Sequence, residues 1–193
     1  MKTIKNNIED TLIIKNSKFI TNIFRLNNDT DIDKCLNDIR NKYSDATHNC
    51  YAYIYESTRK CSDDGEPSGT SGIPMLQVLE KKELSNLLVI VTRYFGGIKL
   101  GASGLVRAYT SSVTTTLDKV DLVELTKGYN IDIIFNYDSI KKIDYILKDN
   151  IILDKEFKDY IRYNLNLDND TLELLNGIKD IDIKINNEVY IEK

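Results

Sequence analysis

The strongest fold signal in this sequence is Leu87-Leu-Val-Ile-Val-Thr-Arg-Tyr-Phe-Gly-Gly-Ile-Lys-Leu-Gly-Ala-Ser-Gly-Leu-Val-Arg107. It starts with an apolar run over residues 87–92, which predicts a strand covered on both faces. Four glycines follow, and from residue 104 to about residue 119 the apolar side chains recur at helical spacing. The stretch therefore predicts a strand, a glycine loop and a helix in succession.

An earlier stretch contains a second glycine loop of opposite charge. Ser62-Asp-Asp-Gly-Glu-Pro-Ser-Gly-Thr-Ser-Gly72 has three acids, whereas residues 93–107 have three bases. Together the two stretches hold seven of the nine glycines. Glycine loses more backbone entropy on folding than other residues, so such clusters are expected where the main chain turns sharply or approaches another group closely. We call residues 62–72 the acidic loop and residues 93–107 the basic loop, and we expect the functional site there.

The sequence before and between the loops indicates mixed α/β structure. Two strands within residues 11–24 are predicted to form a hairpin around Asn16-Ser17. Residues 29–33 supply cap residues and first-turn acids for a helix that extends to about Tyr43. Residues 49–55 alternate like a strand that leads directly into the acidic loop, and Pro74 suits the first turn of a short helix.

A change in composition near residues 127 and 128 predicts two domains, 1–127 and 128–193. Both prolines and all three cysteines precede the change. After it, the order of elements reads β-α-β-β-α-β, which is the ferredoxin-like pattern. The overall prediction is an α+β protein of two domains.

Bulk properties exclude several classes of protein. A net charge of −4 and a pI near 5.2 provide no global basic field, so any binding to nucleic acid must use a local patch. No apolar run approaches the ~20 residues that span a bilayer, and the first ten residues lack the apolar core of a signal peptide. Three cysteines without CxxC spacing argue against a disulfide framework and a zinc site. We expect a cytoplasmic protein without a membrane partner.

The acidic loop has three carboxylates within four residues, Asp63, Asp64 and Glu66. They could collect a divalent cation or act as general bases. They could also shape a turn by accepting backbone hydrogen bonds, or contact a partner. The spacing matches no EF-hand, and the sequence assigns no metal or cofactor.

The basic loop offers main-chain N–H groups at a helix start, flanked by Arg93, Lys99 and Arg107. Such a loop is a candidate cradle for phosphate or another anion. It lacks the glycine-lysine-serine/threonine ending of a Walker A loop and the spacing of a dinucleotide-binding loop. We therefore expect contact with RNA or an acidic protein rather than nucleotide hydrolysis.

His48 is the single histidine, and it is a candidate general base together with Asp64. Cys50 should share its strand face, and hydroxyl groups follow in the acidic loop at Ser68, Thr70 and Ser71. These residues define an alternative hypothesis, a small hydrolase or phosphoryl-handling enzyme. A structural histidine is the competing interpretation.

Tyr51, Tyr53 and Tyr55 recur at period two, which places them on one sheet face. An open face would make them a stacking platform for bases. A covering helix would make them part of the core.

Several segments together resemble the YigZ/IMPACT family. The resemblance rests on His48-x-Cys50, on the acidic loop continued to Pro74, and on VTRYFGGIKLGASGLVRAY at residues 91–109. Ser17-Lys18-Phe19 also fits the opening of that family, so the match covers about residues 17–115. Ser71 stands where many members have alanine, and Ala102-Ser103 where Thr-Gly is usual.

The resemblance implies an N-terminal domain similar to the second domain of ribosomal protein five of the small subunit. It also implies a ferredoxin-like C-terminal domain similar to the last domain of elongation factor G. Eukaryotic relatives in the family regulate translation. The implied function is a protein that binds RNA, the ribosome or a translation factor, and an adaptor between proteins is a further alternative.

The predicted binding residues all belong to the two glycine loops, and His48 and Asp64 remain the catalytic candidates. The set comprises Asp63, Asp64, Glu66, Ser68, Thr70, Arg93, Gly96, Gly97, Lys99, Gly101, Ser103, Gly104 and Arg107.

Overall fold

The computed structural model describes residues 1–27 and 30–192, which fold into two units. The first is Met1–Val123 and the second is Glu124–Lys193. The strand β7 (Leu122–Phe135) runs from the end of the first unit into the second. The predicted boundary at residues 127 and 128 therefore falls inside this strand.

The first unit contains a five-stranded sheet with the order β2-β3-β6-β4-β5. All neighbouring strands pair antiparallel. The central strand β6 is buried from its first residue through Arg93, as the apolar run predicted. The strands are β2 (Ile8–Ile14), β3 (Ser17–Arg25), β4 (His48–Tyr55), β5 (Thr58–Ser62) and β6 (Leu87–Tyr94).

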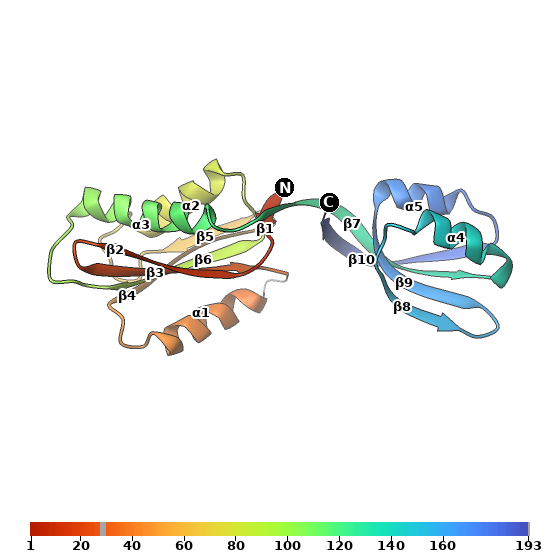
Figure 1. Ribbon diagram of the computed structural model, residues 1–193, viewed down its shortest axis with the longest axis horizontal. Helices are drawn as coiled ribbons and strands as arrows, with labels where there is room; N and C mark the ends of the chain where they lie inside the picture. The colour runs from red at the N-terminus through yellow and green to blue at the C-terminus, as the bar shows by residue number, and fades with distance from the viewer. Residues whose placement is uncertain (28–29, 193) are drawn as a thin grey trace. The chain divides into compact units, whose positions relative to one another are not determined.

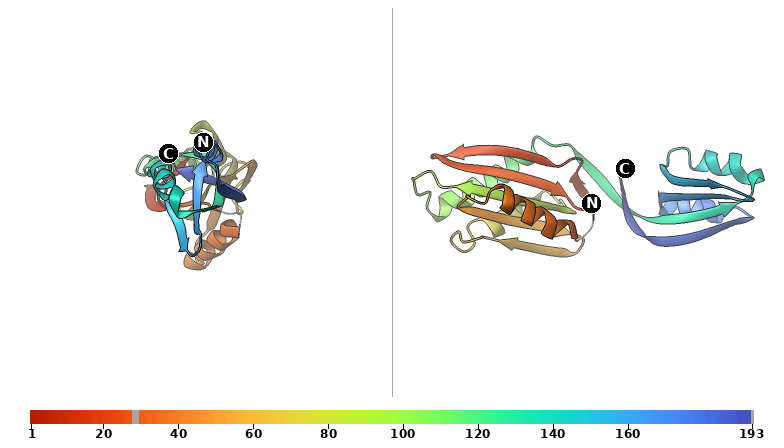
Figure 2. Two further views of the ribbon diagram at one scale, coloured as in Figure 1. Left: turned by 90° about the vertical axis from the view of Figure 1, so that its right-hand side faces the viewer. Right: turned by 90° about the horizontal axis from the view of Figure 1, so that it is seen from below.

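Helices cover both faces of this sheet (Figure 1). The helices α2 (Gly72–Lys81) and α3 (Ala102–Leu117) lie on one face. The helix α1 (Thr30–Lys42) lies on the other, as the right view of Figure 2 also shows. Residues of β6 alternate between the two cores: Val89 and Val91 pack with α2 and α3, and Leu88 and Ile90 pack with α1.

The predicted hairpin is confirmed, with a two-residue turn that lies one residue earlier than predicted. Lys15 and Asn16 connect β2 to β3 with φ values of 45° and 64°. Two consecutive positive φ values are typical of the hairpin turn whose twist matches that of the flanking strands. The turn lies against the basic loop, because Ser17 Oγ accepts a hydrogen bond from the Gly96 N–H at 3.1 Å.

Two short strands were missed by the sequence interpretation. The acidic loop does not follow β4 directly, because β5 lies between them and pairs with β4. Its residues Thr-Arg-Lys-Cys-Ser are exposed or half-buried and lack apolar alternation, so periodicity had no signal to detect. The strand β1 (Lys2–Ile4) is also short. The helix α1 lies where it was predicted, but the cap residue Asp29 lies outside the described residues.

The second unit has the predicted order β-α-β-β-α-β, with a single 3-10 turn before its first helix. Its four strands have the spatial order β10-β7-β9-β8 and pair antiparallel. Both helices lie on one face of this sheet (Figure 1), where they enclose an apolar core. The elements after β7 are η1 (Tyr137–Ser139), α4 (Ile140–Ile146), β8 (Ile152–Phe157), β9 (Ile161–Asp168), α5 (Asn169–Asn176) and β10 (Ile181–Glu192).

Candidate functional site: two glycine loops of opposite design

Asp63 organises the acidic loop from within. Its Oδ1 accepts hydrogen bonds from the Ser71 N–H (3.0 Å), the Ser71 hydroxyl (2.6 Å) and the Gly72 N–H (2.8 Å). Its Oδ2 accepts from the Gly69 N–H at 2.8 Å. Burial alone would raise the pKa of Asp63, but these hydrogen bonds outweigh it and hold the pKa below its usual value. Its carboxylate is therefore used inside the loop.

Asp64 and His48 connect the acidic loop to β4. Asp64 Oδ2 accepts a hydrogen bond from the Asn49 N–H at 2.6 Å, and the Asp64 carbonyl oxygen lies 2.8 Å from His48 Nδ1. A carbonyl oxygen can only accept a hydrogen bond, so His48 Nδ1 is the protonated ring nitrogen and donates the hydrogen bond. This arrangement positions the ring as part of the loop's support.

Glu66 joins three elements beneath the loops. Its side chain is only 2% exposed, and its Oε1 lies 2.6 Å from Arg93 Nη1 of β6. The same oxygen accepts a hydrogen bond from the Tyr109 hydroxyl of α3 at 2.9 Å. Burial, with Cys50 and Glu66 nearby, raises the pKa of Tyr109, so its hydroxyl stays protonated and donates. Glu66 therefore fastens the acidic loop to the strand and helix on either side of the basic loop.

Arg93 differs from the other two bases of the basic loop because it is buried. Its side chain is 6% exposed, and its Nε has no hydrogen-bond partner among the described residues. The guanidinium carbon lies 5.6 Å from the ring centroids of both Phe19 and Phe95. Cation–π contact and the Glu66 carboxylate thus hold Arg93 inside the fold.

The Cys50 thiol and the His48 ring form hydrogen bonds to other groups and not to each other among the described residues. Cys50 is fully buried, and its thiol donates to the Asp63 carbonyl oxygen at 2.9 Å. Burial raises the pKa of Cys50 to about 12, so the nucleophilic thiolate is not formed near neutral pH. His48 Nε2 lies 3.8 Å from Glu66 Oε2, beyond hydrogen-bond distance.

The hydroxyl candidates of the acidic loop also bond elsewhere or face solvent. The Thr70 hydroxyl donates to the Pro67 carbonyl oxygen at 2.6 Å, and Ser68 is exposed. Across residues 1–27 and 30–192, no hydroxyl or thiol forms a hydrogen bond with His48. The same residues contain no group of three His, Cys, Asp or Glu side chains that could hold a metal ion.

The basic loop begins with a tightly packed glycine and continues into open space. A Cβ on Gly96 would collide with the main chain of Asn16 in the hairpin turn. In contrast, Gly97 and Gly101 have φ values of 82° and 73°, and a Cβ at either position would meet no atom within 4 Å. Gly104 follows in the first turn of α3, close to Leu100. The middle of the loop is therefore uncovered.

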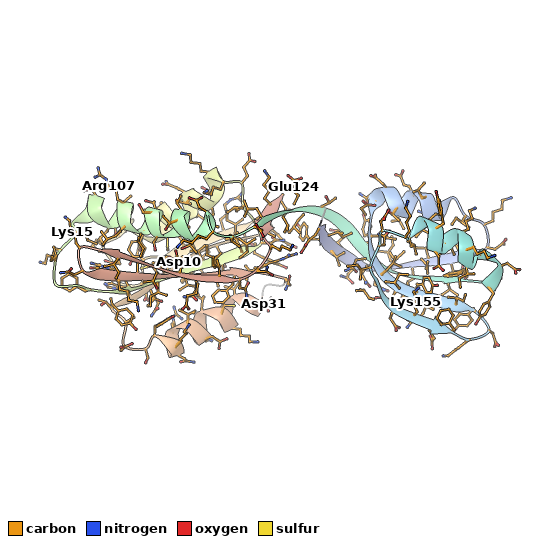
Figure 3. The ribbon with its side chains drawn as sticks, viewed as in Figure 1. Asp10, Lys15, Asp31, Arg107, Glu124 and Lys155 are labelled. Atoms are coloured by element: carbon orange, nitrogen blue, oxygen red, sulfur yellow. The ribbon has the colours of Figure 1, made fainter. Side chains whose placement is uncertain are left out.

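Three exposed cations belong to the basic loop or to the hairpin turn that packs on it: Lys15, Lys99 and Arg107. Figure 3 shows Lys15 and Arg107 at the same end of the first unit. Among the described residues, none of the three forms an ion pair with a carboxylate. Ser103 is exposed in the first turn of α3, whose N-terminus has no side-chain cap. The result is a local basic patch on a protein of net negative charge.

Apolar side chains at the same loop were not singled out by the sequence interpretation. Phe95 is 48% exposed and Ile98 is 46% exposed, on either side of the glycine pair. The sequence signal that could have identified Phe95 is its position directly before two glycines and two residues after Arg93. The basic loop therefore presents apolar as well as positively charged groups.

The tyrosines of β4 face the α1 side of the sheet. Tyr51, Tyr53 and Tyr55 are half-buried and pack against the core formed with α1. The rings of Tyr51 and Tyr53 are stacked, with centroids 6.4 Å apart. This favours their interpretation as part of the core.

Comparison with known proteins places these features in a family. The sequence profile of the Impact N-terminal domain matches residues 15–117. The chain is 36% identical to the IMPACT family member YvyE of Bacillus subtilis, over 99% of this chain and 93% of YvyE. It is also 36% identical to the IMPACT family member YigZ of Escherichia coli, over 58% of this chain and 61% of YigZ.

A structural comparison extends the likeness in fold to both units. The crystal structure of a hypothetical protein matches with a TM-score of 0.67 at 24% identity, covering 96% of this chain and 97% of the other. In the described residues of the present protein, no helix combines the length and apolarity needed to cross a membrane. With a matching family profile over residues 15–117 and a relative aligned along nearly the full length, this chain belongs to the IMPACT family.

Proposed function

We propose that this protein is a cytoplasmic binding protein that contacts RNA, the ribosome or a translation factor through the basic loop. The observation that carries the proposal is that Lys15, Lys99 and Arg107 are exposed and form no ion pair with a described carboxylate, in an uncovered glycine loop and the turn packed on it. Family membership adds support, because eukaryotic members regulate translation. Neither metal nor cofactor has a role in this proposal.

Charge favours RNA among these partners. The chain carries a net charge of −4, whereas the basic loop and its neighbouring turn carry three exposed cations that pair with none of the described carboxylates. Phosphate groups attract such cations by a sequence-independent electrostatic term. The main-chain N–H groups near Gly97, Gly101 and the uncapped start of α3 add donors for phosphate oxygens.

The predicted site residues then divide into two roles. The residues that would contact RNA directly are Lys99, Arg107, Ser103 and the glycines of the basic loop. Ser68 of the acidic loop is also exposed and would belong to this contact surface. Buried or internally bonded residues would hold the surface in shape; these are His48, Asp63, Asp64, Glu66, Thr70 and Arg93.

The division into domains 1–127 and 128–193 belongs to the same proposal. We infer a first domain similar to the second domain of ribosomal protein five of the small subunit. We infer a ferredoxin-like second domain, on the strand order β10-β7-β9-β8 and the element order β-α-β-β-α-β. Domains of these two kinds adjoin one another in elongation factor G, so the fold analogy also favours a ribosomal context.

The direct test is binding of purified ribosomes and labelled ribosomal RNA across a salt series. Wild-type protein should bind at low salt and weaken as salt rises. Lys99→Glu combined with Arg107→Glu should abolish binding. Lys141→Glu with Lys142→Glu, which reverses two exposed charges of α4, is the matched control and should bind like wild type. Absence of binding at low salt, or equal binding by the Lys99/Arg107 variant, would overturn the RNA version of the proposal.

A further inference from the structure

We infer that Phe95 is a stacking platform for an unpaired base, so that the ligand of the basic loop is single-stranded RNA. This inference rests on the proposed function and specifies its ligand. It starts from the exposure of the ring, which is 48% for the residue as a whole. A large aromatic residue with about half of its surface in water has apolar area available for a partner.

The main chain holds Phe95 in a defined position. Its N–H donates to the Thr47 hydroxyl at 3.1 Å, just before β4 begins. The next residue, Gly96, is pressed against the hairpin turn at Asn16 and donates its N–H to Ser17 Oγ. Only the two side-chain torsions of Phe95 remain to be ordered when a base binds, so the entropic cost of stacking is small.

Arg93 supports the ring from inside the protein. Its guanidinium carbon lies 5.6 Å from the Phe95 centroid, and the Arg93 side chain is almost fully buried. Glu66 anchors the guanidinium in turn. The aromatic ring is therefore backed by a fixed cation, while about half of the residue stays open to solvent.

The surrounding charges match a nucleic-acid backbone. Lys99 lies four residues after Phe95, Lys15 lies in the turn that packs on Gly96, and Arg107 follows in α3. An aromatic ring beside cations that follow the backbone is the combination that binds single strands without sequence preference. In a duplex the bases are already stacked, so Phe95 would add nothing there. An acidic protein segment would use the same cations but would treat Phe95 and Ile98 as an apolar contact.

The chain contains no tryptophan, so Phe95→Trp introduces a unique fluorescent reporter at the proposed platform. Titration with a single-stranded RNA of about 12 nucleotides, within the range of single-strand footprints, should quench this fluorescence through base stacking. The same RNA as a duplex should bind through charge alone and leave the fluorescence unquenched. Poly-glutamate is the probe for an acidic protein segment.

The second readout is the affinity of variants that carry no tryptophan, measured by the fluorescence anisotropy of labelled RNA. Phe95→Ala and Phe95→Leu should each bind the single strand about tenfold more weakly or worse, with duplex affinity unchanged. Phe95→Leu keeps an apolar side chain over Arg93, and thermal melting verifies that both variants fold. Tyr145→Ala is the matched control: Tyr145 is 73% exposed and lies 5.6 Å from the Lys148 ammonium, and its removal should leave RNA binding unchanged.

The outcomes separate this inference from the proposed function. If Lys99→Glu with Arg107→Glu abolishes RNA binding but the Phe95 variants bind like wild type, the stacking inference is overturned and the proposed function stands. Equal affinity for duplex and single strand, or binding without quenching of the tryptophan, also overturns it. Binding of poly-glutamate in place of RNA would identify the loop as a protein-docking surface, and it would overturn the stacking inference and the RNA version of the proposed function. Absence of RNA binding at low salt would likewise overturn the stacking inference and the RNA version of the proposed function.

Discussion

The acidic loop and the basic loop are both rich in glycine, yet they use their charged groups in opposite ways. In the acidic loop, Asp63 and Glu66 direct their carboxylates inward, to loop N–H groups and to Arg93. In the basic loop, Lys99 and Arg107 extend into solvent without carboxylate partners in the described part of the chain. The comparison indicates that the first loop is the support of the site and the second is its surface.

Substitution of Glu66 should have the largest effect on stability. Glu66→Gln leaves the Arg93 charge buried without a counter-charge, which should lower the free energy of unfolding by about 3–5 kcal/mol. The measurement is urea denaturation. Glu9→Gln is the matched control, because Glu9 and Lys42 are also 2.6 Å apart but lie at the surface. The control should lose less than about 1 kcal/mol.

A double-mutant cycle sharpens this prediction. Adding Arg93→Met to Glu66→Gln removes the uncompensated charge, so the double variant should lose less stability than the sum of the single losses. If the two losses simply add, or if Glu66→Gln behaves like the surface control, Glu66 is not the fastening point of the two loops.

Removal of the Asp63 carboxylate should have the next largest effect. Asp63→Ala leaves the N–H groups of Gly69, Ser71 and Gly72 without their acceptor, and the expected loss is about 2–4 kcal/mol in urea denaturation. Asp64→Ala removes one backbone hydrogen bond, from Asn49, and should cost about 1 kcal/mol. A larger loss for Asp64→Ala would reverse the roles assigned to the two residues.

Two neighbouring glycines offer a smaller and more local contrast. Gly96→Ala forces a methyl group into the main chain of Asn16 and should cost up to about 3 kcal/mol. At Gly97 a methyl group would meet no other atom, so Gly97→Ala should cost only the strain of an alanine at a φ of 82°, about 1 kcal/mol. Thermal or urea unfolding measures both. Equal losses would show that the packed and open parts of the basic loop do not differ as described.

The pH dependence of stability gives the smallest predicted effect. The pKa of Asp63 is lowered in the folded state, so its contribution is complete above the unfolded value of about 3.9 and is lost as pH falls through the folded value. The difference in stability between wild type and Asp63→Asn should therefore be constant above about pH 5 and shrink in more acidic solution. A difference that stays constant down to acid unfolding would contradict an ionised, hydrogen-bonded Asp63.

Local patterns were sufficient to predict much of the fold. The apolar run at residues 87–92 predicted the buried central strand, and helical spacing located α1 and α3. The alternation and turns after residue 128 predicted the six main elements of the second unit. The edge strand β5 was missed because its exposed residues need no apolar pattern.

The division of roles within the site could not be read from local patterns. Glu66 and Arg93 are 27 residues apart in the chain. They meet because the pairing of β4 with β6 places Arg93 opposite His48, and His48 holds the acidic loop that contains Glu66. A list of acids and bases treats Arg93 like Lys99, although tertiary packing buries one and exposes the other. Phe95 was visible in the sequence, but its exposure depends on how the loop leaves the sheet.

The most direct test of the contrast between the loops is the salt dependence of RNA binding by Lys99→Gln with Arg107→Gln. For a single strand, the slope of log affinity against log salt is about −0.7 per neutralised phosphate, so loss of two contacts should make the slope shallower by about 1.4. The stability of this variant should stay within about 0.5 kcal/mol of wild type, because both side chains are exposed. An unchanged slope, or a large loss of stability, would contradict a basic loop that faces outward to bind RNA.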